Sequence, residues 1–228
     1  MPTVKNVVIA VAGMGKRLGL GKAKCLVKVC DKTILEYQLN LLRDVENIFL
    51  VTGFREDDVM NFAKKIRRDI IFVRNANFQH TKTLESFYLA AKIIDDYAIF
   101  MDGDMIIEPN SFKKFLSDAA FRHKEGREGL TVAVSERISD DPVYAEIIAD
   151  GDGSNKIQGF SYEKKSAYEW ANVVYMPAKL MASGSSHMFE HIQKFLPANV
   201  GVIDRLEIDT PEDLRVAEKF LKSSNWFA

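Results

Sequence analysis

The sequence predicts an α/β protein with a largely parallel sheet that helices cover on both faces. Short apolar runs rich in β-forming residues alternate with segments of helical periodicity through the first 120 residues, which is the pattern of such a sheet. The length of 228 residues and the hydrophobic content of 47% allow one domain with a full core. Residues 130–176 consist mainly of strand-like runs, so we expect an insertion there that extends the sheet.

Strand-like runs, each followed by a helical segment, make up the first half of the chain. Val7–Val11 is an apolar run that leads into a glycine-containing loop, and Tyr97–Met101 leads directly into Asp102-Gly103-Asp104. The apolar residues of segment 83–94 recur at helical spacing. We therefore expect strands at 7–11, 48–52, 70–73 and 97–101, and helices at 34–42, 57–67, 83–94 and 110–120.

The second half begins with a charged, glycine-containing stretch at 121–129, which predicts a surface loop. Glycine, aspartate and asparagine at 151–155 predict turns between strands. The chain is thus expected to form one domain, 1–228, with a β-rich insertion at 121–176 and a closing segment at 177–228. The expected elements are strands at 130–134, 144–149, 157–162, 171–175 and 202–208, and helices at 178–195 and 211–221.

The composition excludes several classes of function. The formal net charge of −1 gives no support to a chain-wide role in binding nucleic acid or membranes. No apolar run approaches the roughly 18 residues that a membrane span needs, and the polar start of the chain predicts no signal peptide. Cys25 and Cys30 are too few for a disulfide framework and are expected to be reduced. These features predict a cytoplasmic protein, and they do not predict its oligomeric state.

The loop after the first strand combines glycines with cations, as a phosphate-binding loop would. It reads Gly13-Met14-Gly15-Lys16-Arg17-Leu18-Gly19, and Lys24-Cys25-Leu26 follows. No register fits a P-loop, and a dinucleotide fingerprint fails because Leu18 stands where its third glycine belongs. Glycines allow backbone N–H groups to approach phosphate oxygens, and fixed cations offset the charge of a triphosphate.

Together with Leu26, these residues resemble the sugar-phosphate nucleotidyltransferase family, whose members carry G-x-G-x-R and then Pro-Lys-x-Leu after the first strand. Ala23 replaces the proline. The resemblance implies a Rossmann-like (GT-A-type) three-layer sandwich with a mostly parallel mixed sheet, in which residues 1–120 bind the nucleotide and the insertion binds the acceptor. It implies that Arg17 and Lys24 are catalytic and stabilise charge at the α-phosphate and the departing pyrophosphate. The expected nucleotide-binding residues of the loop are Ala12, Gly13, Met14, Gly15 and Lys16.

Two acidic positions follow strand-like runs. Asp102 and Asp104 lie at the end of a buried strand, where open α/β sheets bind ligands. Asp209 precedes Thr210-Pro211, which resembles the cap and first residue of a helix. By the resemblance, Asp104 and Asp209 hold Mg²⁺ against the α-phosphate, in keeping with the preference of Mg²⁺ for few carboxylates plus phosphates and water. Asp102 is either a supporting nucleotide-binding group or a turn residue.

The resemblance also indicates where the base and the acceptor bind. Thr52, Gly53, Thr83 and Ser86 occupy positions at which the family reads the base, and the stretch GKAKCLVKV is most similar to cytidylyltransferases. We therefore expect CTP and a small phosphorylated acceptor such as phosphocholine, aminoethylphosphonate or a polyol phosphate. A sugar 1-phosphate is the alternative acceptor. Aromatic and acidic residues of the insertion could hold an amine, or they could simply pack on the faces of the strands. The expected acceptor contacts are Tyr144, Glu146, Tyr162 and Trp170.

Three other functions are compatible with parts of the sequence. His187-Met188-Phe189-Glu190-His191 matches the zinc-protease pattern H-x-x-E-H, but no third ligand is identifiable, so ordinary helix histidines are favoured. A GT-A glycosyltransferase would share the nucleotide-binding architecture and would release no pyrophosphate. A non-catalytic nucleotide-binding subunit is disfavoured because Arg17, Lys24, Asp104 and Asp209 are all present.

Overall fold

The computed structural model describes residues 4–125, 129–137, 139–151 and 154–227. Residues 126–128 of the predicted loop and the predicted turn residues Asp152 and Gly153 lie outside this part of the chain. Residues 1–3, at the start of the polar segment that precedes the first strand, also lie outside it.

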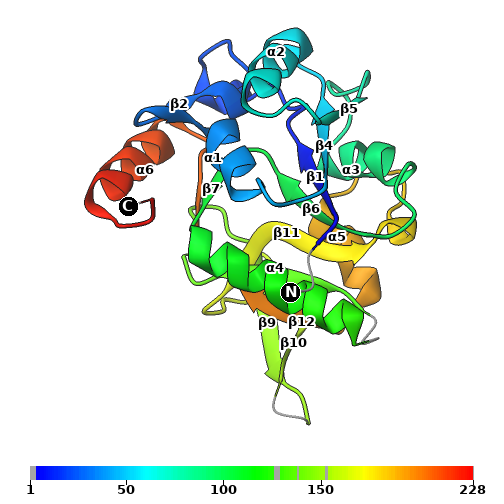
Figure 1. Ribbon diagram of the computed structural model, residues 1–228. Coiled ribbons are helices and arrows are strands. Elements are labelled where there is room, and N and C mark those ends of the chain that lie inside the picture. Colours follow the sequence, from blue (N-terminus) through cyan, green and yellow to red (C-terminus); the bar gives the residue numbers. More distant parts are fainter. Residues whose placement is uncertain (1–3, 126–128, 138, 152–153, 228) are drawn as a thin grey trace.

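A nine-stranded sheet in the order β5-β4-β1-β6-β11-β8-β12-β10-β9 runs through the whole molecule (Figure 1). From β5 to β6 neighbouring strands are parallel, and beyond β6 the sheet is mixed, since β11 runs antiparallel to both β6 and β8 while β12 is parallel to β8. The strands are β1 (Asn6–Ala10), β4 (Asn47–Thr52), β5 (Ile71–Arg74), β6 (Tyr97–Asp102), β8 (Thr131–Ser135), β9 (Tyr144–Ala149), β10 (Asn155–Ser161), β11 (Glu169–Pro177) and β12 (Ala198–Val202).

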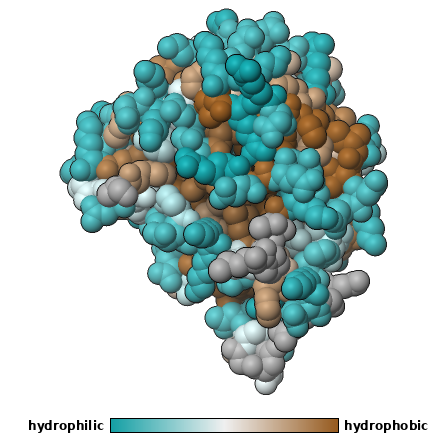
Figure 2. Space-filling model, viewed as in Figure 1, coloured by the Kyte–Doolittle hydropathy of each residue, from teal (hydrophilic) through white to brown (hydrophobic). Residues whose placement is uncertain are grey.

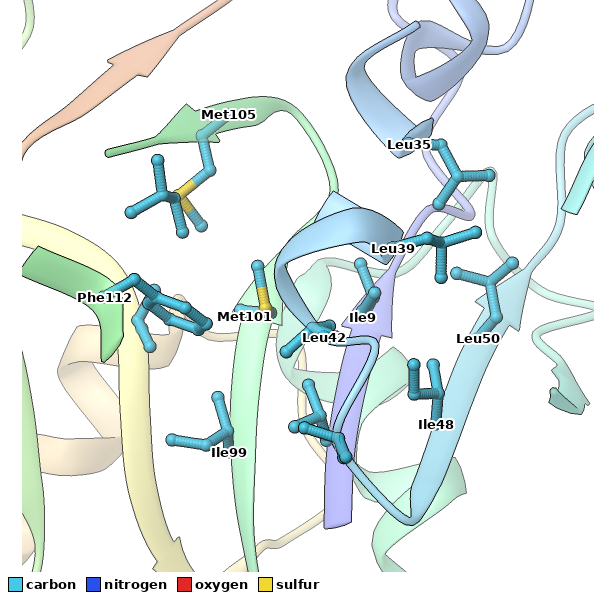
Figure 3. Close-up of a cluster of buried hydrophobic side chains, with 14 of the residues drawn as sticks. Ile9, Leu35, Leu39, Leu42, Ile48, Leu50, Ile99, Met101, Met105 and Phe112 are labelled. Atoms are coloured by element: carbon cyan, nitrogen blue, oxygen red, sulfur yellow. The ribbon is translucent and has the colours of Figure 1, made fainter. Parts of the chain in front are cut away.

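Helices cover both faces of this sheet. On one face α1 (Ile34–Leu41), α2 (Glu56–Ile66) and α4 (Pro109–Lys124) pack against β1, β4 and β6, and Figure 3 shows part of this core. On the other face α3 (Thr83–Ala91) and α5 (Met188–Ile192) bury their apolar sides. Hydrophilic residues cover the outer surface of α2, at the top of Figure 2, as expected for an amphipathic surface helix. The predicted fold class of a Rossmann-like three-layer α/β sandwich is therefore confirmed.

Short elements complete the fold at the carboxyl ends of the parallel strands. A two-stranded ladder joins β7 (Met105–Ile107) to β13 (Arg205–Glu207), and a second one joins β2 (Lys28–Val29) to β3 (Lys32–Thr33). The last helix, α6 (Pro211–Ser223), packs beside them through a small apolar cluster that includes Val29, Ile106 and Leu206. The remaining elements are single 3₁₀ turns at Lys16–Leu18, Lys24–Leu26, Ala178–Leu180 and Gln193–Phe195.

Three element predictions differ from the structure. The predicted helix at 178–195 is wrong, because this segment contains only α5 between two 3₁₀ turns. The run Ser183-Gly184-Ser185-Ser186 interrupts it, and these residue types favour turns over helix interiors. The predicted loop at 121–129 begins too early, since α4 continues to Lys124. The single strand predicted at 202–208 is divided between β12 and β13.

The predicted division into a first half, an insertion and a closing segment stays a prediction, and the sheet runs through all three parts. Across the described residues, no helix combines the length and the apolar character that crossing a bilayer requires. Cys25 is buried and Cys30 half-buried, and both are free thiols.

Candidate functional site

The loop after β1 brings two cations toward the carboxyl ends of the parallel strands. Arg17 and Lys24 each belong to a short 3₁₀ turn. Gly15 precedes the first turn with φ of +56°, and a Cβ atom there would lie 3.0 Å from Cβ of Lys24. Glycine satisfies both the left-handed backbone and this close approach, so the glycine pattern in the sequence serves to place Lys24.

Lys24 lies between two carboxylates that are far apart in the sequence. Its Nζ is 2.8 Å from Oδ2 of Asp104 and also donates a hydrogen bond to Oδ1 of Asp209. Arg17 binds the other oxygen of Asp209 at 2.7 Å. The side chain of Lys24 is only 13% exposed, so this contact is sheltered from solvent. The fold thus brings together the four residues on which the sequence-based proposal depends.

Backbone hydrogen bonds set the spacing of the two aspartates. Glu207 pairs with Met105 in the β7–β13 ladder, and the N–H of Ile208 donates to the carbonyl oxygen of Asp104 at 2.9 Å. The Asp213 carboxylate accepts a hydrogen bond from the N–H of Asp209 as part of the N-terminal cap of α6. Asp104 and Asp209 therefore protrude from a shared rigid support.

Gly103 lets the chain turn tightly between Asp102 and Asp104. A Cβ atom at this position would lie 2.4 Å from Cγ1 of Val11 and 2.7 Å from the carbonyl oxygen of Ala10. The second contact is with the backbone of β1, which cannot move aside cheaply. The glycine is therefore required by packing against the first strand.

We expect Gly103→Ala to lower the free energy of unfolding by about 1–3 kcal/mol, the usual cost of overpacking a buried site. Urea denaturation monitored by circular dichroism measures this change. Gly151→Ala is the matched control, because a Cβ atom there meets no atom of the described residues within 4 Å, and it should change stability by less than about 0.5 kcal/mol. Equal stability of Gly103→Ala and the wild type would contradict the packing argument.

Asp104, Glu207 and Asp209 form a group that could hold a metal ion, since each offers a carboxylate oxygen within 4.8 Å of the others. Oδ1 of Asp104 is buried and has no hydrogen-bond partner among the described residues, which leaves it free to coordinate. Three carboxylates are hard oxygen ligands of the kind that Mg²⁺ prefers. Sequence reasoning missed Glu207, although its position two residues before Asp209 was a usable signal.

The charges of these groups depend on one another. Burial disfavours the Lys24 ammonium, but the adjacent Asp104 and Asp209 carboxylates outweigh it and raise the pKa of Lys24 above its ordinary value. Burial likewise opposes ionisation of Asp104, and Lys24 reverses the effect, so the pKa of Asp104 is lowered. At Asp102, burial together with the Asp104 and Glu207 charges outweighs the opposite effect of Lys24 and Arg205 and raises the pKa well above the ordinary value. Burial raises the pKa of Glu207 to about 7.

Glu207 is held in place by Arg205, which also forms a buried ion pair with Glu169. Arg205 is 4% exposed, and its guanidinium binds Glu207 at 2.7 Å and Glu169 at 2.8 Å. Glu169 is 1% exposed and also accepts hydrogen bonds from the N–H and the hydroxyl of Ser139. This network was not predicted, because no local pattern links strand β11 to strand β13.

A cavity of about 520 Å³ extends from the carboxylate cluster toward the β-rich segment. Its lining includes the acidic residues Asp102, Glu207 and Asp209 and the aromatic residues Trp170, Phe189 and Tyr162, and we call the part around these rings the aromatic end. The rings of Tyr162 and Phe189 meet edge to face at 5.5 Å between centroids. Of all the predicted site residues, catalytic and metal-binding ones included, the lining contains Arg17, Thr83, Asp102, Tyr162, Trp170 and Asp209.

Several predicted site residues do not line this cavity. Ser86 is 3% exposed, and its hydroxyl accepts a hydrogen bond from the amide of Asn75. Thr52 is buried at the end of β4 next to Gly53, where a Cβ atom would meet Phe78. Lys24 and Asp104 are not in the lining, although Lys24 binds Asp209, which is. Residues 12–16 of the loop are not in the lining either. The other two predicted acceptor residues lie in strand β9 outside the lining, where Glu146 pairs with Lys164 at 2.6 Å: Tyr144 and Glu146.

The two histidines of the H-x-x-E-H pattern do not form a metal-capable group within the described residues. His191 is buried, and its Nε2 lies 2.9 Å from the carbonyl oxygen of Leu180. Burial lowers the pKa of His191. His187 lies at the N-terminus of α5 and stacks on Phe189.

Known proteins resemble this chain in sequence and in fold. Residues 7–170 match the family described as MobA-like NTP transferase domain. The chain is 25% identical to choline-phosphate cytidylyltransferase of Streptococcus pneumoniae, over 96% of this chain and 99% of the relative. The solved structure of the CTP:phosphocholine cytidylyltransferase from Streptococcus pneumoniae superposes with a TM-score of 0.75 at 20% identity, covering 96% and 99% of the two chains. The inositol-1-phosphate CTP transferase from T. maritima gives 0.72 at 20% identity, covering 95% and 94%.

Proposed function

Because the chain belongs to the MobA-like NTP transferase family, we propose that it transfers CMP from CTP to a small phosphorylated acceptor and releases pyrophosphate. The family makes the chain a nucleotidyltransferase. The choice of CTP is supported by the relatives named above. They are CTP-using transferases, and this chain matches them over nearly their whole lengths.

The observation that carries this proposal is the meeting of Lys24, Asp104 and Asp209 at the ends of the parallel strands. Open α/β sheets bind their ligands at this edge. Arg17 of the cationic, glycine-containing loop and Asp209 both line the 520 Å³ cavity. A triphosphate held by the loop would present its α-phosphate to an acceptor in the cavity.

Asp104, Glu207 and Asp209 are the residues that would hold Mg²⁺, which when bound supplies positive charge at the α-phosphate and orients its oxygens. The unsatisfied oxygen of Asp104 is the structural feature that fits such an ion. Lys24 now neutralises the same two aspartates. When metal and nucleotide bind, we expect its ammonium to turn toward the phosphate oxygens.

The chain's own residues then contribute position and charge. An acceptor phosphate has a second pKa near 6 and is largely ionised at neutral pH, so its oxygen can attack the α-phosphorus without a general base. Lys24 and Arg17 are placed to stabilise the negative charge that develops on the α-phosphate and on the departing pyrophosphate. The walls of the cavity hold the acceptor in line with the leaving group.

The acceptor that the cavity favours carries a positively charged amine or quaternary ammonium group. The lining of the cavity combines the aromatic rings of Trp170, Tyr162 and Phe189 with the carboxylates of Asp140 and Asp141. Aromatic faces and carboxylates together attract such cations. Phosphocholine and aminoethylphosphonate fit this description better than a neutral polyol phosphate or a sugar 1-phosphate.

A pyrophosphate-release assay tests the proposal. Each of the four nucleoside triphosphates is combined with phosphocholine, aminoethylphosphonate, inositol phosphate and several sugar 1-phosphates, with and without magnesium. We expect release with CTP and an amine-bearing acceptor only when magnesium is present. Release with another triphosphate would overturn the choice of CTP, and an absence of release in every combination would overturn the proposed reaction.

A further inference from the structure

Asn172 interrupts the regular geometry of strand β11, which lies in the middle of the sheet. Its φ is +57°, in the left-handed region, and β11 shifts register against β8 between Trp170 and Val174. On the other side β11 pairs regularly with β6 from Val173, opposite Met101, onward. Asn172 therefore lies at a bulge, and bulges re-aim side chains next to binding sites.

The bulge turns Asn172 into the cavity. Every other residue of β11 is buried, whereas Asn172 is half-exposed and belongs to the cavity lining. It is one residue beyond the Val173–Met101 pair, on the side of Asp102. Trp170, which also belongs to the lining, precedes it by two residues in the same strand.

Within the described residues, the carboxamide of Asn172 makes no hydrogen bond. Glu169 and Glu207, which line the same cavity, are instead both bound by Arg205. The backbone alone does not call for an amide here, because glycine adopts positive φ at lower cost than asparagine. The side chain is thus free to bind a molecule in the cavity.

We propose that the carboxamide of Asn172 donates a hydrogen bond to the phosphoryl oxygens of the acceptor and so determines which acceptors bind productively. This inference rests on the proposed nucleotidyl transfer. The acceptor's ammonium group would occupy the aromatic end, and its phosphoryl group would lie toward the reaction centre, beside Asn172. The described lining contains more carboxylates than cations, and carboxylates repel a phosphate. A neutral donor attracts the phosphoryl group without competing for the metal.

Asn172→Gly removes the carboxamide and keeps the backbone conformation that the bulge requires. We expect its KM for the acceptor to rise roughly tenfold to a hundredfold, which corresponds to the loss of one hydrogen bond to a charged group. The KM for CTP should stay the same, and the melting temperature should stay the same or rise. Asn172→Asp keeps the shape of the side chain and adds a negative charge, so it should weaken acceptor binding further.

Cys30→Gly is the matched control, because Cys30 also has a positive φ, of 58°, and lies outside the cavity lining. It relieves the same backbone conformation and should change neither KM. An unchanged acceptor KM in Asn172→Gly would overturn the inference. An equal rise of both KM values would also overturn it, because that pattern indicates a structural role.

Calorimetric titration with phosphocholine and with aminoethylphosphonate separates this inference from the proposed reaction. If the wild type binds one of these compounds but never releases pyrophosphate, the proposed reaction fails. Weaker binding by Asn172→Gly then still supports the contact. Equal binding by the two proteins, or no binding by either, contradicts the contact whatever the assay of turnover shows.

Discussion

Arg205→Met is expected to lower the free energy of unfolding by about 3–5 kcal/mol, because it leaves a buried carboxylate without its partner. Glu169 is 1% exposed and would keep only the hydrogen bonds from Ser139. Methionine is unbranched and apolar, so the variant removes the charge while filling much of the space. Guanidinium chloride denaturation at neutral pH measures the difference.

Two further variants separate burial from charge. Replacing both partners, Arg205→Met with Glu169→Leu, should recover most of the loss, because a buried ion pair and an apolar pair of similar volume are often of equal stability. Lys164→Met breaks the exposed pair with Glu146 and should cost less than about 1 kcal/mol. If Arg205→Met lowers the free energy of unfolding by less than about 1 kcal/mol, the Glu169 carboxylate stays buried without its partner at little cost, and the prediction is wrong.

Lys24→Ala is expected to lower kcat/KM. The fall should correspond to a loss of about 2–4 kcal/mol of transition-state stabilisation, which is typical for the loss of a preorganised donor. Single-turnover measurement of CMP transfer isolates this effect from product release. The variant also leaves Asp104 and Asp209 without the ammonium that now lies between them. Magnesium should therefore raise the melting temperature of Lys24→Ala more than that of the wild type.

The control for this prediction is Lys22→Ala, which removes an exposed lysine from the same loop and should retain wild-type turnover. Lys24→Arg keeps the charge but changes its geometry, so an intermediate rate is expected. Near-normal transfer by Lys24→Ala would remove this residue from the mechanism and leave it a purely structural counter-ion.

Much of this site could be predicted because its residues stand in local patterns. The strand at 7–11, the glycines beside Arg17 and Lys24, and Asp104 directly after a buried strand could each be read from neighbouring positions. The expected strands of the insertion also match β8 to β11 closely. Local readings succeed here because strand ends and tight turns depend on nearby residues.

The rest depends on contacts between distant segments. Arg205 and Glu169 meet only because β11 and the β7–β13 ladder lie side by side at the carboxyl ends of the strands. Ser86 has the chemistry of a base-reading residue, yet its hydroxyl is bonded to Asn75, which lies on a different element. The bulge at Asn172 has no sequence signal either, since asparagine occurs in many loops and strands.

The β7–β13 ladder fixes the distance between Asp104 and Asp209 through main-chain hydrogen bonds. Side chains elsewhere in the cavity can consequently be exchanged without altering that distance. A protein built in this way can acquire a new acceptor by substitution at Tyr162, which lines the cavity and is exposed, while its phosphate chemistry stays intact. For an engineer who wishes to redirect the enzyme, the aromatic end is the place to diversify, and the ladder is the part to leave alone.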